Sequence, residues 1–181
     1  NEASFHTSQG GCLSCAGGGA VGADLPGERG EYEVKAAFLY SFTKFVEWPA
    51  ATFAEVRSPI VIGVFEKNPF GPELEKTVQG RRVNERPFLV KVINTVEEAK
   101  TVQVLFVAAD VSKARPGLLR ELAGAPVLTV GETAEFMKVG GIIAFVLRGD
   151  KVHFQINIAA ARQAGIRISA QMQKLALPMP K

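Results

Sequence analysis

Two cysteines near the start of the chain have a spacing that could do chemistry. Cys12 and Cys15 are separated by two residues, as in thiol-disulfide enzymes, and His6 lies upstream of them. Redox catalysis also needs a strand and a helix N-terminus that lower the pKa of the attacking thiol, and a glycine-rich stretch provides neither. His6, Cys12 and Cys15 fall one ligand short of a structural zinc site, and haem attachment would need histidine where Ala16 stands. We expect a passive disulfide between Cys12 and Cys15, or two free thiols.

The remaining catalytic candidates are incomplete sets. A serine triad needs a histidine base, and the second histidine, His153, falls on the outward face of an expected strand, with no G-x-S-x-G turn in the chain. Glu66 and Asp110 each follow an apolar run, as the acids of phospho-accepting receiver domains do, but Asp110 before "VSKA" is also typical of a local cap. The run 60–65 leads into "EKNPFG", which is not a phosphate-binding glycine loop. We therefore expect no enzymatic activity and no cofactor.

Arg167 and Ser169 form the best candidate for a small-ligand contact. They alternate along "IRIS", just before an expected final helix, so a guanidinium and a helix N-terminus could meet an anion or a carboxylate there. The simpler alternative is a solvated arginine and a serine that caps the helix.

Trp48, the single tryptophan, lies between Glu47 and Pro49. At the margin of an apolar helix face it could close the core as a lid, with its indole N–H bonded to a nearby carbonyl. It could also stay partly exposed and anchor a protein partner, since tryptophan is enriched at such contacts. We expect the lid and keep the anchor as the alternative.

Composition indicates one globular unit. The chain has 181 residues, 47% of them hydrophobic and 22% charged, and no apolar run approaches the length of a membrane span of about 20 residues. Residues 31–181 hold 20 Lys and Arg against 15 Asp and Glu, which is mildly basic. The bases are scattered rather than gathered in a stripe, so we do not expect nucleic-acid binding.

The first 30 residues are rich in glycine and alanine without periodicity, and we expect a flexible leader followed by a single domain over residues 31–181. From Tyr32 a helical pattern places Val34, Leu39, Phe42 and other apolar residues on one arc. Tyr40 lies on the opposite side, and Lys35 is a charge misplaced on the apolar arc. Pro49 predicts that the helix ends at Trp48.

Four apolar runs of strand length follow, at residues 60–65, 88–93, 102–108 and 126–130, with short helices predicted at 72–78, 96–100 and 118–123. This alternation predicts an α/β fold with a mostly parallel central sheet covered by helices on both faces. The run 140–157 predicts a C-terminal antiparallel hairpin around Gly149-Asp150, with Val152 and Phe154 inward and Gln155 outward. A helix near 158–164 and a last helix capped by Ser169 complete the chain.

Several segments together resemble the YfiR-like family of periplasmic proteins. They are "KAAFLYSFTKFVEWP" (35–49), "VIGVFEKNPFG" (61–71), "GRRVNERPFLVKVI" (80–93), "PVLTVGE" (126–132) and "GGIIAFVLRGDKVHFQINIAAARQAGIRISAQMQKLA" (140–176). The resemblance spans residues 31–177 in consistent order. It implies a sheet flanked by helices, in agreement with the pattern above.

The resemblance also implies a function. It is that of an exported, non-enzymatic regulator that represses the periplasmic region of an inner-membrane diguanylate cyclase, which lowers cyclic-di-GMP and biofilm formation. It further implies a homodimer and an outer-membrane OmpA-like lipoprotein that can sequester the repressor. Export to the periplasm, which the resemblance implies, requires a signal peptide, and none is present in this sequence. Since the chain begins at Asn1 without a methionine, we expect a segment upstream to have been removed, either in the cell or by cloning. The alternative is a periplasmic small-ligand module that reports occupancy to a membrane sensor. Residues 31–181 contain no cysteine, so control by disulfides inside the domain is excluded.

Overall fold

The computed structural model describes residues 26–179, and it opens with the long helix α1 (Pro26–Phe45). Cys12, Cys15 and most of the expected leader lie outside the described residues. The helix begins earlier than the predicted start near Glu31. It ends earlier too, because Val46–Glu47 forms the short strand β1, which pairs with a strand near the C-terminus.

The buried face of α1 differs from the predicted one at two positions. Leu39 and Phe42 are buried as expected, but Val34 is 44% exposed and Tyr40 only 9% exposed. Tyr40 is buried because it packs edge-on against Phe88, with ring centroids 5.5 Å apart. The arc predicted from periodicity is therefore rotated toward the flank of the helix that faces the sheet edge.

A seven-stranded sheet forms the centre of the domain, in the order β3-β4-β2-β5-β6-β7-β8. Strands β4, β2, β5, β6 and β7 run parallel, and the antiparallel strands β3 and β8 stand at the two ends. This confirms a mostly parallel α/β sheet with a C-terminal hairpin. The bounds are β2 (Ile60–Phe65), β3 (Arg82–Val83), β4 (Arg86–Ile93), β5 (Val104–Phe106), β6 (Leu128–Gly131), β7 (Ile143–Arg148) and β8 (Lys151–Ile156).

Short helices connect these strands, and several begin at a side-chain cap. Those predicted are α2 (Glu73–Val78), α3 (Val96–Ala99), α5 (Leu118–Glu121), α7 (Ile158–Gln163) and α8 (Ala170–Leu175); α4 (Ala109–Ala114), α6 (Ala134–Lys138) and a 3₁₀ turn (Ala50–Thr52) were not predicted. Thr133 shows the recurring cap, since its hydroxyl accepts a hydrogen bond from the N–H of Phe136 at 3.1 Å. Thr95, Asn157 and Ser169 cap their helices in the same way.

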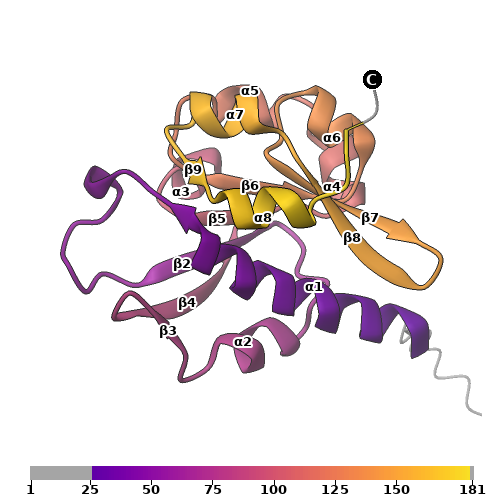
Figure 1. Ribbon diagram of the computed structural model, residues 1–181, viewed down its shortest axis with the longest axis horizontal. Coiled ribbons are helices and arrows are strands. Elements are labelled where there is room, and N and C mark those ends of the chain that lie inside the picture. The colour runs from indigo at the N-terminus through magenta and orange to yellow at the C-terminus, as the bar shows by residue number, and fades with distance from the viewer. Residues whose placement is uncertain (1–25, 180–181) are drawn as a thin grey trace, which may run out of the picture.

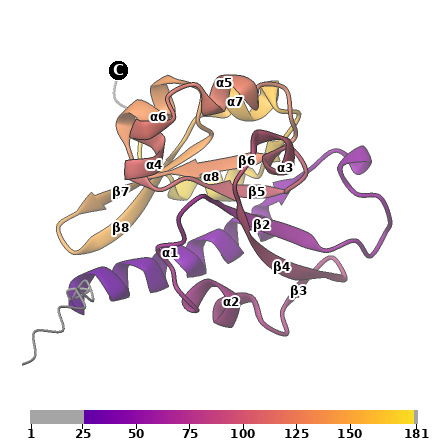
Figure 2. The same ribbon diagram turned by 180° about the vertical axis from the view of Figure 1, so that it is seen from behind.

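Helices lie on opposite sides of the sheet. In Figure 1, α1 crosses the near face with α8 beside it, and in Figure 2, from behind, α3 lies in front of the sheet. The cover is thin at β4, where Leu89 and Val92 are 41% and 48% exposed. Residues paired along neighbouring strands show that these two side chains belong to opposite faces of β4.

The hairpin β7–β8 turns at Gly149-Asp150 as predicted, with Val146 opposite His153 in register. The outward placement of Gln155 was wrong, because Gln155 is only 9% exposed. Its side-chain amide donates a hydrogen bond to the carbonyl of Pro178 at 2.9 Å, and Leu177 forms a parallel bridge beside it. The C-terminal residues thus run along the outer edge of β8 and bury Gln155.

Candidate functional site

A two-stranded ribbon brings the three sequence-predicted contact residues into one region. Strand β1 pairs antiparallel with β9 (Arg167–Ile168), with Glu47 opposite Arg167. The N–H of Ser169 donates to the carbonyl of Phe45 at 2.9 Å, which extends the pairing by one bond. Trp48 follows β1 directly, so residues from the two ends of the domain meet here.

Trp48 is half-buried, and its indole N–H donates to the carbonyl of Gln103 at 3.0 Å. The hydrogen bond to a carbonyl confirms that part of the lid interpretation. Phe53 meets the indole edge-on, with centroids 6.4 Å apart. The residue is not fully buried, so a role in partner contact stays a prediction.

Arg86 fixes the loop that follows Trp48. Its guanidinium lies 3.7 Å from the centroid of the Phe53 ring, and the same group donates to the carbonyls of Glu55 and Ser58, both at 2.9 Å. A guanidinium group is planar, so it can stack on an aromatic ring and donate hydrogen bonds within its own plane at the same time. We refer to Trp48, Phe53 and Arg86 as the Trp48 surface.

Arg167 and Ser169 are close in the chain, but their side chains have different surroundings. Arg167 is exposed and lines a cavity of about 230 Å³ together with Ile158, Ala161, Arg162, Ile166, Ile168 and Gln173. The hydroxyl of Ser169 accepts from the N–H of Met172 at 3.2 Å, so this side chain caps α8 as predicted. Helix α8 is short, and its N-terminus is already used by this cap.

Glu66 and Asp110 reach the carboxyl edge of the sheet but do not form an acidic pair. Lys67 binds Asp110 with 2.9 Å between Nζ and the carboxylate, and Arg115 lies 3.3 Å from the carboxylate of Glu66. The hydrogen bond from Lys67 lowers the pKa of Asp110, and the N–H of Val111 bonds the same side chain. Among residues 26–179, no group of acidic, histidine or cysteine side chains is arranged to hold a metal ion.

Lys35, the charge that the helical pattern places on the apolar arc, is indeed buried, and the structure shows the partners that the sequence does not reveal. It is 3% exposed, and its ammonium group binds both Glu31 and Glu132 while lying 4.5 Å from the centroid of the Tyr32 ring. The second oxygen of Glu132 accepts from the N–H of Ala109 at 2.9 Å. Glu31, one helical turn before Lys35, was the available sequence signal, but nothing in the sequence pairs Lys35 with Glu132.

This buried cluster borders a cavity of about 580 Å³ at the carboxyl ends of β5 and β6, partly walled by Phe145 and Leu147. Burial of the phenol raises the pKa of Tyr32, and the charge and hydrogen bond of Glu132 raise it further. The cluster thus joins α1 to the ends of β5 and β6 by charge-assisted hydrogen bonds between largely buried side chains.

A family model described as YfiR/HmsC-like matches residues 32–177. The chain belongs to the YfiR/HmsC-like family. Two solved structures are similar to it: a conserved domain protein from Vibrio cholerae, at 12% identity and a TM-score of 0.53 over 80% of this chain, and an ABC domain in complex with L-Trp from Streptococcus pneumonia, at 13% identity and a TM-score of 0.45 over 64%. This chain spans 58% and 53% of those two proteins, respectively.

YfiR/HmsC-like proteins are known as periplasmic regulators of cyclic-di-GMP signalling, and the family is regulatory rather than catalytic. The match begins at Tyr32, inside α1, and ends at Leu177, beside β8, so it includes the whole sheet and the β1–β9 ribbon. None of the helices described within residues 26–179 has the length and apolar character needed to cross a membrane.

Proposed function

We propose that this YfiR/HmsC-like protein binds the periplasmic region of an inner-membrane diguanylate cyclase and represses it, without enzymatic activity of its own. Repression lowers cyclic-di-GMP and biofilm formation. The observation that carries the proposal is the family match over residues 32–177, which includes the complete sheet.

The Trp48 surface is the contact that we assign to this partner. Tryptophan and arginine are among the residue types enriched in binding hot spots, and contacts with Phe53 hold Trp48 and Arg86 in place before binding. A surface that is ordered in advance loses less entropy on association. Arg167 lies next to it through the β1–β9 ribbon and adds a charge at the rim.

The test uses the full chain as bait for bacterial membranes, together with a deletion strain. We expect recovery of a membrane protein that has a periplasmic sensor and a cytoplasmic cyclase domain, and a rise in cyclic-di-GMP on deletion. Unchanged cyclic-di-GMP in a strain that makes the protein would contradict repression.

Variants at the Trp48 surface separate binding from folding. Trp48→Ala should cost about 2–3 kcal/mol of unfolding free energy, less than a fully buried tryptophan, because the ring is only half-buried. Trp48→Phe keeps an aromatic ring and should cost about 1 kcal/mol for the lost hydrogen bond to Gln103. If Trp48→Phe folds and recovers the partner as well as the wild type does, Trp48 is a lid and not a contact.

We also propose a homodimer and sequestration by an outer-membrane OmpA-like lipoprotein, both on the family resemblance. Sedimentation velocity of the full chain should give a dimer at micromolar concentration. A monomer at every concentration measured would contradict the homodimer. The contact with the cyclase would still be tested by the pull-down.

The cavity beside Arg167 favours a second candidate, a small-ligand module that reports occupancy to a membrane sensor. An exposed guanidinium at the mouth of a cavity of about 230 Å³ suits a small carboxylate or amino acid. A thermal-shift screen of such compounds should find one that stabilises the wild type but not Arg167→Ala, with Arg148→Ala on the distant hairpin as control.

A further inference from the structure

The outer edge of β4 is open along most of its length. Strand β3 pairs only with the first residues of β4, through Arg82 opposite Pro87 and Val83 opposite Arg86. Residues 88–93 pair with β2 on their inner side, and no described strand pairs with their outer side. Alternate N–H and C=O groups of residues 88–93 therefore point outward, as on any edge strand.

The opposite end of the sheet is closed differently. There the N–H of Leu177 donates to the carbonyl of Phe154 at 2.8 Å, and Gln155 binds the carbonyl of Pro178. The chain's own C-terminal residues thus occupy the outer side of β8, whereas nothing among the described residues does so at β4. The open edge is specific to one end of the molecule.

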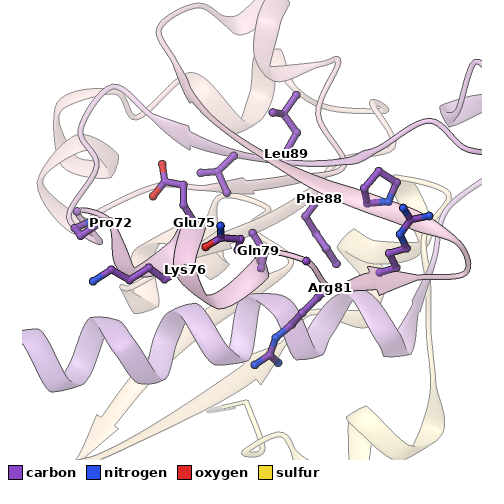
Figure 3. Close-up of a pocket in the computed structure, with 13 residues that line it drawn as sticks. Pro72, Glu75, Lys76, Gln79, Arg81, Phe88 and Leu89 are labelled. Atoms are coloured by element: carbon purple, nitrogen blue, oxygen red, sulfur yellow. The ribbon is translucent and has the colours of Figure 1, made fainter.

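A groove of about 790 Å³ runs beside this edge, with α2 as one wall and β4 as the other. Figure 3 shows Glu75 and Gln79 on the α2 wall, Phe88 directed from β4 toward α1, and Leu89 directed to the other side of the strand. An added strand would therefore find backbone groups on the edge and an apolar side chain on each face. These are the two elements of recognition by strand addition.

The basic side chains around the groove favour a negatively charged partner segment. Arg81 and Arg82 line it against the acid Glu75, and Lys91 is exposed on β4 beyond Leu89. Lys76 also lines the groove, but its ammonium group is paired with Glu73 at 2.7 Å. Within residues 26–179, the ion pairs involve neither Arg81 nor Arg82. The Arg81 guanidinium is engaged by Tyr40, since it lies 4.6 Å from the centroid of that ring. A second copy of this edge would bring the same basic groups together, and like charges on paired strands are destabilising.

We propose that the outer edge of β4, residues 88–93, is a docking site for an extended acidic segment of a partner protein, which adds to the sheet as a strand and lies along the α2–β4 groove. Its backbone bonds the edge, its alternate apolar side chains pack on Phe88 and Leu89, and its carboxylates face Arg82. The site adjoins the Trp48 surface, since Arg86 begins the same strand, but it does not depend on the identity of the cyclase.

The probe for this site is a fluorescein-labelled, blocked hexapeptide of alternating glutamate and valine, added to the full chain. We expect saturable binding that weakens as salt is raised, and slower amide hydrogen exchange in residues 88–93 on peptide addition. A peptide of alternating lysine and valine, and a glutamate-valine peptide methylated on alternate backbone nitrogens, should each bind at least about tenfold more weakly.

Matched variants locate the binding. Leu89→Asp and Arg82→Glu, both at exposed positions, should each weaken the acidic peptide at least about tenfold with unchanged melting temperature. Leu147→Asp, at a side chain 53% exposed on the distant hairpin, should leave binding unchanged. The proposal would be overturned if the acidic peptide did not bind saturably, or if the methylated peptide bound as tightly as the unmethylated one. It would also be overturned if the peptide slowed hydrogen exchange only outside residues 88–93, or if Leu89→Asp dissociated a dimer. None of these results depends on whether the pull-down recovers a cyclase.

Discussion

The ammonium group of Lys35 is held inside the domain by two carboxylates. The side chain of Glu132 is only 10% exposed, so Lys35→Met leaves a nearly buried carboxylate without its cation. We expect a loss of about 3 kcal/mol in unfolding free energy, measured by urea denaturation. Lys76→Met, at an exposed ion pair with Glu73, should lose less than about 0.5 kcal/mol.

Glu132→Gln provides the double-mutant cycle for this pair. The variant with both changes should be more stable than the sum of the two single losses predicts, by at least about 1 kcal/mol. Additive losses would mean that the contact between Lys35 and Glu132 contributes little, and that Glu31 alone neutralises the lysine.

Two tyrosines on α1 should respond to alkaline pH in opposite directions. Burial and Glu132 raise the pKa of Tyr32 above the ordinary tyrosine value of 10.0, so above pH 10 the native state keeps a proton that the unfolded chain releases. At Tyr40, burial acts to raise the pKa, but hydrogen bonds and charges from Lys44 and Arg81 outweigh it and lower the pKa below 10.0. Stability therefore falls with rising pH through Tyr32 and rises through Tyr40.

The prediction concerns urea midpoints measured between about pH 8 and 11. Tyr32→Phe should show a shallower alkaline fall than the wild type, and Tyr40→Phe a steeper one. Lysines titrate in the same range, so each variant is compared with the wild type at every pH. Curves parallel to the wild type for both variants would show that neither phenol is perturbed by folding.

Continuous apolar runs in the sequence were enough to predict the central strands. Residues 60–65 were predicted as a strand, and β2 has the same bounds, because a strand buried on both faces needs an unbroken apolar sequence. Helices α4 and α6 were not predicted, although the even shorter α3 and α5 were. Packing stabilises helices of this length more than sequence propensity does, so their sequences are a poor guide. Strand β1 exists only because distant β9 pairs with it, which no local pattern reveals.

The candidate site was predictable to a similar extent. Trp48, Arg167 and Ser169 were chosen separately, from residue type and local spacing, and the ribbon that joins them depends on tertiary pairing. The open edge of β4 was not predicted, because a strand run in sequence does not tell which neighbours it will have. Its alternation of Leu89 and Lys91 on one face was the available signal.

Gly141 tests how α6 is joined to β7. The ring of Phe136, 1% exposed, lies against both Gly131 and Gly141, and a Cβ at Gly141 would stand 2.7 Å from the carbonyl oxygen of Phe136 and closer still to its ring. Gly141→Ala should therefore cost about 2–3 kcal/mol of unfolding free energy. Gly117→Ala meets only Glu121 at 3.7 Å and should change stability by less than about 0.5 kcal/mol. Equal stability of both variants would mean that Phe136 can move.

At the scale of the whole molecule, the core extends from Ala36 in α1 to Met172 in α8. The expected division into a leader of residues 1–30 and a domain of residues 31–181 predicts that the first residues contribute little to stability. Deletion of residues 1–25 should shift the melting temperature, followed by circular dichroism, by less than about 2 °C.

The paired change Cys12→Ser and Cys15→Ser controls for the chemistry of the removed segment. A loop closed over three residues constrains little of the unfolded chain, so the melting temperature of this variant should equal that of the wild type with and without reductant. A fall of more than about 5 °C in the deletion alone would show that the first residues pack on the domain. If the melting temperature falls equally in the deletion and in the cysteine variant, the stabilisation comes from the cysteines. The passive role predicted for Cys12 and Cys15 would then be wrong.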